Sequence, residues 1–98
     1  MPTNEERYRK WVNHVRNRIA EEPRQKAWVI EKECWKLIDL AIDPICSDEK
    51  VKRMLTLILD DSDMQLLEEL SPFDEGDISQ ASLLVRKVKT RLISDLQG

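Results

Sequence analysis

The sequence is short of turn-forming residues, since its 98 residues include two glycines and four prolines. All-β domains, collagen-like chains and low-complexity chains need many more of these residues, so we exclude those classes. There are also two cysteines and one histidine, with no Cys-x-x-Cys spacing. A disulfide framework usually needs four or more cysteines and a structural zinc site needs four ligands, so we expect neither, and no cofactor.

Long apolar runs are absent as well. No run reaches the roughly 18–20 residues of a membrane-spanning helix, and the charged residues 1–7 lead into no apolar stretch of the kind found in secretory signals. We therefore expect an intracellular protein, in the cytoplasm or, for a viral chain, in the host cell, with no membrane partner. Both cysteines are expected to be reduced, Cys34 as a small core residue and Cys46 reactive only if exposed.

The motifs of common enzyme classes are missing too. The chain has no GxSxG, P-loop, GxGxxG or HExxH motif, and His14 has no nucleophile pattern near it. A calcium loop starting at Asp61 would place Leu66 and Pro72 where an EF-hand needs Gly and Glu. We therefore expect a protein that is not an enzyme.

What the sequence does contain is helical periodicity. A capping box at Thr3–Glu6 opens a first helix, which is predicted to end near Glu21–Glu22 because Pro23 disfavours helical geometry in the residue before it. Its apolar stripe consists of Tyr8, Val12, Val15 and Ile19. A second helix is predicted from Pro23 to the residue before Asp43–Pro44. Its stripe consists of Ala27, Ile30, Cys34, Leu37, Ile38 and Ala41, widened by Trp28, Trp35 and Ile42. This arc is too wide for a surface helix, so we expect a central helix or one shared with a partner.

Three further helices are predicted in the second half of the chain. Ser47 is expected to cap one that carries apolar residues from Val51 to Leu59, and Ser62, with Gln65, to cap a short one ending near Leu70. Asp77 is expected to cap the last, after the loop-like stretch Ser71–Gly76, and its stripe consists of Ile78, Ala81, Val85, Val88, Leu92 and Leu96. Short loops predict one all-α domain over residues 1–98. We expect a compact helical bundle of four main helices plus one short helix, mostly antiparallel.

The net charge of −3 conceals a segregated distribution. Residues 1–20 carry a net charge of +3, residues 54–85 carry −8 with no base, and residues 86–91 carry +4. On the first helix Arg7, His14 and Arg18 share one side, with Lys10 slightly further round and Trp11 between this strip and the apolar stripe. A basic strip of this kind fits a solvated face with Trp11 flanking the core, and it also fits contact with the chain's own acidic block, a nucleic acid or an acidic protein partner. The sequence leaves these alternatives open.

Glu31 falls inside the apolar arc of the second helix, near Trp28 and Trp35. A buried carboxylate without a partner is costly, so we expect either an ion pair with an arginine on the first or the last helix, or a position for Glu31 at the edge of the apolar face. The alternative is that Glu31 belongs to a partner-binding surface together with the three tryptophans, because tryptophan is enriched at binding hot spots. That surface would consist of Trp11, Trp28, Glu31 and Trp35.

These features favour a non-enzymatic protein–protein interaction module, such as an accessory protein, adaptor, inhibitor or small subunit of a complex. We expect it to form a homodimer through apolar helix surfaces, because the second helix carries more apolar surface than a bundle of this size needs. The alternative function is that of an RNA or single-stranded nucleic-acid binder. Its contacts would be Arg7, Lys10, Trp11, Arg18, Arg86, Lys87 and Lys89. The acidic overall charge argues against this alternative, because nucleic-acid-binding domains are usually strongly basic.

Overall fold

Five α-helices and one 3₁₀ turn account for most of the chain in the computed structural model, which describes residues 3–43, 45, 48–70 and 75–97. The elements are α1 (Asn4–Glu21), η1 (Pro23–Gln25), α2 (Lys26–Ile42), α3 (Glu49–Leu55), α4 (Asp61–Glu69) and α5 (Glu75–Gln97). These residues include no strand, so the predicted all-α class is confirmed. Nor does any helix in the described ranges have the length and apolar character needed to cross a membrane.

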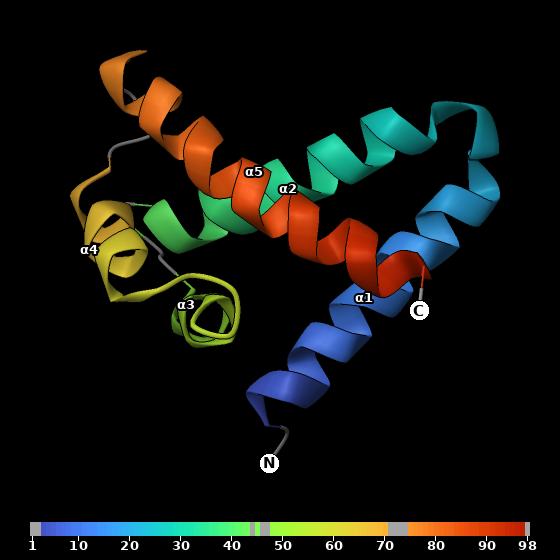
Figure 1. Ribbon diagram of the computed structural model, residues 1–98, viewed down its shortest axis with the longest axis horizontal. Coiled ribbons are helices and arrows are strands. Elements are labelled where there is room, and N and C mark those ends of the chain that lie inside the picture. The colour runs from blue at the N-terminus through green and yellow to red at the C-terminus, as the bar shows by residue number, and fades with distance from the viewer. Residues whose placement is uncertain (1–2, 44, 46–47, 71–74, 98) are drawn as a thin grey trace.

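The three long helices α1, α2 and α5 cross one another obliquely (Figure 1). α5 packs across the middle of α2. The C-terminal end of α1 lies next to the N-terminal end of α2, and the two helices diverge from there in the shape of a V. The shorter helices α3 and α4 pack near the other end of α2. A helical bundle is therefore confirmed, whereas four main helices and mostly antiparallel packing are not.

The first two helices begin and end close to the predicted residues. The Thr3 hydroxyl accepts a hydrogen bond from the Glu6 backbone N–H at 3.2 Å, which confirms the N-terminal cap of α1. α1 also ends at Glu21, as predicted. Pro23, however, opens the 3₁₀ turn rather than the second helix, so α2 starts three residues later, at Lys26. The tighter turn lets the chain reverse direction before the α-helix resumes.

Aspartates rather than serines cap the two short helices. The Asp48 side chain caps α3, and the predicted cap Ser47 lies outside the described residues. The prediction that Ser62 caps α4 is wrong. Asp60 accepts from the Asp63 N–H at 2.8 Å, and Asp63 accepts in return from the Asp60 N–H at 3.4 Å. This reciprocal pair is a capping box two residues earlier, and it forms because aspartate is as good an N-cap as serine.

The helix boundaries in the second half also differ from those predicted. α3 ends at Leu55, and the backbone then turns through hydrogen bonds from Leu57 N–H to Met54 and from Ile58 N–H to Leu55. α5 begins at Glu75, two residues before the predicted cap Asp77. Of the loop predicted over residues 71–76, residues 75 and 76 are helical and residues 71–74 lie outside the described part of the chain.

The core is built from the predicted apolar stripes. Val15, Cys34, Ile38, Val88 and Leu92 have no exposed surface. Burial raises the pKa of the Cys34 thiol to about 12, so this cysteine is the inert core residue that was predicted, whereas Cys46 lies outside the described residues. Two residues at the starts of the predicted stripes, Ala27 and Ile78, are exposed and do not belong to the core. The predicted stripes also omitted Val29 and Leu84, which are buried.

One contact joins the acidic block to the basic segment that follows it. The Lys87 ammonium group donates to both carboxylate oxygens of Asp63, at 2.7 and 2.8 Å, and so joins α5 to α4. These hydrogen bonds hold the pKa of Asp63 below its ordinary value. Part of the segregated charge is therefore neutralised within the chain.

Two adjacent leucines of α5 test this description of the core. Leu84 is 1% exposed in the core, and Leu83 is 50% exposed. We expect Leu84→Ala to lower the free energy of unfolding by about 2–5 kcal/mol, because it leaves a cavity. Leu83→Ala should change it by about 0.5 kcal/mol or less. Urea denaturation of both variants checks this, and equal losses would contradict the packing of α5.

Candidate functional site

The candidate site lies where one face of α1 meets one face of α2, in what we call the α1–α2 cleft. Residues three or four apart share a helix face. The side chains that form the cleft are Arg7, Trp11, His14 and Arg18 of α1 and Glu33, Lys36, Leu37 and Leu40 of α2. The cleft has a polar half near η1 and an apolar half near α3.

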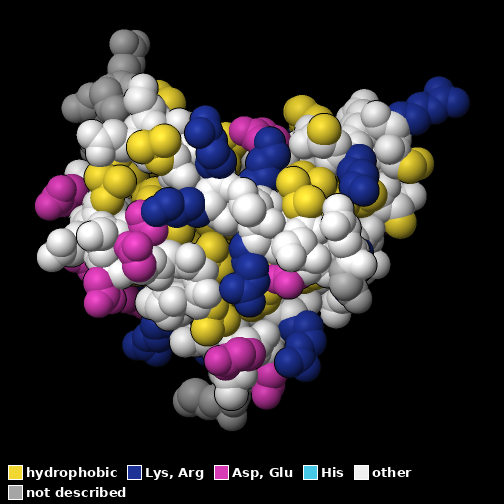
Figure 2. All heavy atoms as spheres, viewed as in Figure 1, with side chains coloured by type: hydrophobic (Ala, Val, Ile, Leu, Met, Phe, Trp, Pro, Cys, Tyr) yellow, Lys and Arg dark blue, Asp and Glu magenta, His cyan; other side chains and the backbone are white. Residues whose placement is uncertain are grey.

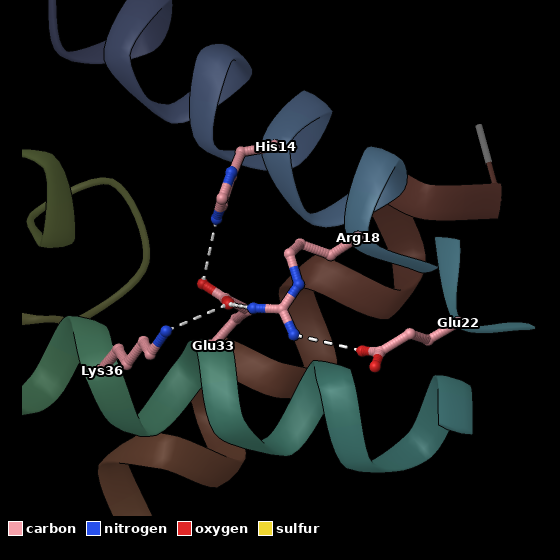
Figure 3. Close-up of polar contacts among 5 residues, drawn as sticks. All are labelled: His14, Arg18, Glu22, Glu33 and Lys36. Atoms are coloured by element: carbon pink, nitrogen blue, oxygen red, sulfur yellow. Dashed lines mark hydrogen bonds and ion pairs between the residues drawn. The ribbon is translucent and has the colours of Figure 1, made fainter. Parts of the chain in front are cut away.

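The carboxylate of Glu33 is the centre of the polar half (Figure 3). Glu33 is 3% exposed and is the one buried polar or charged residue in the described part of the chain. It points from α2 toward α1, where Arg18 Nη1 lies 2.9 Å from Oε1 and His14 Nε2 lies 3.3 Å from Oε2. Lys36 Nζ reaches back along α2 to within 3.7 Å of Oε1. Both carboxylate oxygens are therefore engaged by cations or by an imidazole.

Arg18 links this centre to the end of its own helix. Its Nη2 lies 3.2 Å from Oε2 of Glu22, while its Nη1 contacts Glu33, so the guanidinium lies between two carboxylates (Figure 3). Removing one partner of a buried ion pair is strongly destabilising, because the other charge is left without compensation. The polar half of the cleft therefore holds α1 and α2 together, and its charged side chains pair with one another.

The apolar half of the cleft is a groove with a volume of about 260 Å³. It is lined by Arg7 and Trp11 of α1, Leu37 and Leu40 of α2, and Lys50, Val51 and Met54 of α3. Leu37 and Met54 are buried at its base, whereas Leu40 is 47% exposed and Trp11 is half-buried. We call this the Trp11 groove.

The rim of the Trp11 groove is positively charged. Arg7 and Lys50 both line the groove, and no acidic side chain does. Neither cation forms an ion pair with another described residue. The Trp11 groove therefore combines an apolar floor with two cations that lack a counter-ion among the residues described.

The structure divides the four predicted partner-binding residues between two sides of α2. Glu31 comes two positions before Glu33, and Trp35 comes two positions before Leu37. Two positions correspond to a rotation of 200° around a helix, so Glu31 and Trp35 lie on the side of α2 away from the cleft. Trp11 lies in the groove, whereas Trp35 lies on the flank of α2 that faces α5. Trp28 is 50% exposed, with the Lys32 ammonium group 4.6 Å from its ring centroid.

Glu31 lies at the edge of the apolar face and forms an intramolecular ion pair, which are the two outcomes expected for it if it is not part of a partner surface. Its side chain is 44% exposed, and its partner is a lysine of α5 rather than an arginine: Lys89 Nζ lies 2.6 Å from Oε2. The Trp35 indole N–H donates to Oε1 at 3.1 Å. Lys89 and Trp35 together lower the pKa of Glu31. Of the two helices expected to supply a partner, the last one does so, but the partner is a lysine and not the expected arginine.

Sequence reasoning missed Glu33, the carboxylate that is in fact buried. A signal was present, because Glu33 lies one turn after Val29 and one turn before Leu37, both of which are buried. The apolar stripe predicted from the sequence omitted Val29, so nothing in it pointed to Glu33.

The seven residues of the nucleic-acid alternative are not brought together as one free basic surface. Arg18, Lys87 and Lys89 are paired with Glu33, Asp63 and Glu31, respectively. Lys89 contacts the flank of α2 opposite the cleft, and Arg86 lies on α5. Arg7, Lys10 and Trp11 remain as a short basic and aromatic stretch on α1.

No protein-family model matches the chain, and comparison with curated proteins and with solved structures gives no significant match.

The Glu33 centre makes a prediction about stability. We expect Glu33→Gln to lower the free energy of unfolding by about 1–3 kcal/mol, because the half-buried Arg18 loses the nearer and more buried of its two carboxylate partners and keeps only Glu22. Glu49→Gln is the matched control, since Glu49 is 66% exposed and paired with Lys52 at 3.5 Å. The control should change stability by about 0.5 kcal/mol or less. Urea denaturation measures both variants, and similar losses would show that Glu33 does not hold the helices together.

The Glu31 contacts make a prediction about pH. Because the folded-state pKa of Glu31 is lowered, its stabilising contribution is complete above the ordinary Glu pKa and is lost as the pH falls through the folded value. The Trp35 indole N–H signal in NMR spectra should therefore titrate with a midpoint below 4.5. Lys89→Met should raise that midpoint, because it removes the largest cause of the shift. An unchanged midpoint in this variant would contradict the contact.

Proposed function

We propose that this protein is a non-enzymatic protein-interaction module that binds an acidic, amphipathic helix of a partner protein in the Trp11 groove. The observation that carries the proposal is the apolar groove whose rim has two cations and no acid, Arg7 and Lys50. Complementary charge steers partners toward such a surface and selects their orientation.

The size of the groove supports a protein side chain as its occupant. Pockets for drug-sized molecules usually measure about 300–1,000 Å³, and the Trp11 groove measures about 260 Å³. Helix-in-groove recognition places apolar side chains, spaced three or four residues apart, into a groove of this kind. Leucines of the bound helix would pack against Trp11 and Leu40, and its flanking glutamates would reach Arg7 and Lys50.

The fold supports a groove that is formed before the partner binds. Its walls come from α1, α2 and α3, and the Glu33 centre ties the first two of these helices together one to two turns away. A preformed groove binds more tightly, because less conformational entropy is lost on association. Trp11 is itself half-buried and contacts the Tyr8 ring, with ring centroids 6.0 Å apart.

Self-association, which the sequence predicts, has separate support. Trp28 and Leu83 are each 50% exposed and do not line the Trp11 groove. Apolar side chains of this size in contact with solvent are candidates for a homodimer interface. The nucleic-acid alternative has less support, because three of its seven residues are paired within the chain.

A pair of synthetic peptides of about 15 residues tests the proposal. Both carry leucines at helical spacing; one has glutamates at its other positions and the other has lysines. We expect the glutamate peptide to bind at least ~10-fold more tightly and to shift the Trp11 indole N–H signal, because its charge complements the rim of the groove. Arg7→Glu with Lys50→Glu should reverse this preference. The matched control, Arg24→Glu with Lys26→Glu, makes the same change in net charge outside the groove and should leave it intact.

Two further variants test the apolar floor. Leu40→Asp should abolish binding of the glutamate peptide, whereas Leu83→Asp, at a similarly exposed leucine, should not. Equal binding of the two peptides, or equal effects of the two leucine variants, would contradict the proposal. Sedimentation velocity at micromolar concentration tests self-association separately. A dimer that dissociates in Leu40→Asp but not in Leu83→Asp would identify a second copy of this chain, rather than a different protein, as the occupant.

A further inference from the structure

A second hollow lies beside α1, between α1, α5 and the turn that follows α3. It has a volume of about 460 Å³. Its walls are formed by Tyr8, Arg9, Val12, Arg16, Leu57 and Arg91. The acids Glu5 and Asp95 also line it. Figure 2 shows cationic and acidic side chains gathered around apolar ones below the C-terminal half of α5, where α1 passes underneath. We call this hollow the arginine pocket.

The charge of Asp95 is already neutralised inside the arginine pocket. The Tyr8 hydroxyl donates a hydrogen bond to its carboxylate, and Arg91 Nε donates to the same oxygen at 3.0 Å. The Arg91 guanidinium also lies over the Tyr8 ring, 5.5 Å from its centroid. Arg91 and Asp95 therefore form a fixed neutral pair against Tyr8.

The other two arginines keep their positive charge. Arg16 donates from Nη2 to the Asp95 backbone carbonyl at 2.8 Å and from Nη1 to the Asn13 side-chain oxygen at 3.3 Å, and both acceptors are neutral. Arg9 forms no hydrogen bond or ion pair with another residue that the structure describes. Against these two charges, Glu5 is the remaining acid of the lining. The arginine pocket therefore has an excess of one positive charge.

The rest of the lining is apolar and held in place. Tyr8 and Val12 are buried, and Leu57 is half-buried against the core. The volume of about 460 Å³ lies within the usual range for small-molecule pockets, unlike that of the Trp11 groove. Because Arg16 and Arg91 are already tethered, a ligand would not have to immobilise them.

We infer that the arginine pocket binds a small organic carboxylate. The planar guanidinium of Arg9 or Arg16 presents paired N–H donors that match the two oxygens of a carboxylate. The apolar body of the ligand packs on Tyr8, Val12 and Leu57. The single excess charge suits a monoanion better than the dianion of a phosphate monoester. This site is separate from the Trp11 groove and does not depend on the proposed function.

Benzoate, benzamide and phenyl phosphate are the probes that test this inference by NMR titration of the full chain. We expect benzoate to bind with a dissociation constant on the order of 1 mM, as befits so small a ligand, and to shift signals of Tyr8 and Arg16. Benzamide has nearly the same shape without the charge and should bind at least ~10-fold more weakly, because it has one acceptor oxygen and no negative charge and so cannot form a bidentate ion pair with a guanidinium. Phenyl phosphate should bind no more tightly than benzoate.

Arginine variants locate the site. Arg9→Gln should weaken benzoate binding at least ~10-fold without affecting the fold, which circular dichroism verifies, because Arg9 has no described partner to lose. Arg24→Gln removes the same charge outside the pocket and should leave the affinity unchanged. Equal weakening in both variants, or equal affinity for benzamide and benzoate, would overturn the site. Tighter binding of phenyl phosphate would overturn the assignment to carboxylates.

Discussion

The buried carboxylate of Glu33 is the contact on which the arrangement of α1 and α2 depends. An ionised acid removed from water must be compensated at short range, and here Arg18 and His14, one turn apart on α1, do so. This fixes which turn of α1 faces which turn of α2. Trp11, one turn earlier on the same face of α1, then lies against Leu37 and Leu40 further along α2. The Trp11 groove therefore exists because the polar half of the cleft sets the register of the two helices.

The chain uses part of its segregated charge to hold its helices together, and Arg7, Arg9, Lys10 and Arg16 of α1 are among the cations that form no ion pair with another described residue. Lys87 and Lys89 of α5 pair with Asp63 of α4 and Glu31 of α2, respectively. Exposed pairs of this kind each contribute little to stability. After these pairings, Arg7 lies at the groove on one side of α1 and Arg9 at the pocket on another. Neighbouring residues of one basic segment thus serve two different surfaces.

Two hollows that share α1 as a wall differ in the features that decide what each can hold. The Trp11 groove is small, almost wholly apolar at its floor, and positive only at its rim. The arginine pocket is larger and contains charged groups, some of them already paired, within its walls. The first suits apolar side chains flanked by acids, and the second suits a compact ligand with an acidic group of its own. Their difference follows from which residues of α1 face α2 and which face α5.

Prediction from the sequence worked where the cause is local. Thr3 caps α1 because the hydroxyl and the N–H it accepts from are three residues apart, and the stripe Tyr8, Val12 and Val15 is buried because a helix repeats every 3.6 residues. Prediction failed where two local solutions compete. Asp60 and Ser62 both fit a capping pattern, and propensity does not separate them. It also failed for Glu33, because a helical wheel does not show how far neighbouring helices cover each flank.

The sequence by itself determined the all-α class, most of the residues that form the core, and the strip of Arg7, Trp11, His14 and Arg18 along one side of the first helix. These depend on spacings of three to four residues. Only the tertiary structure decided which charge meets which. Glu31 and Lys89 are 58 residues apart and Tyr8 and Asp95 are 87 apart, so their contacts depend on where whole helices pack. For the same reason, the structure alone separated the cations that form ion pairs between helices from those that form none with another described residue.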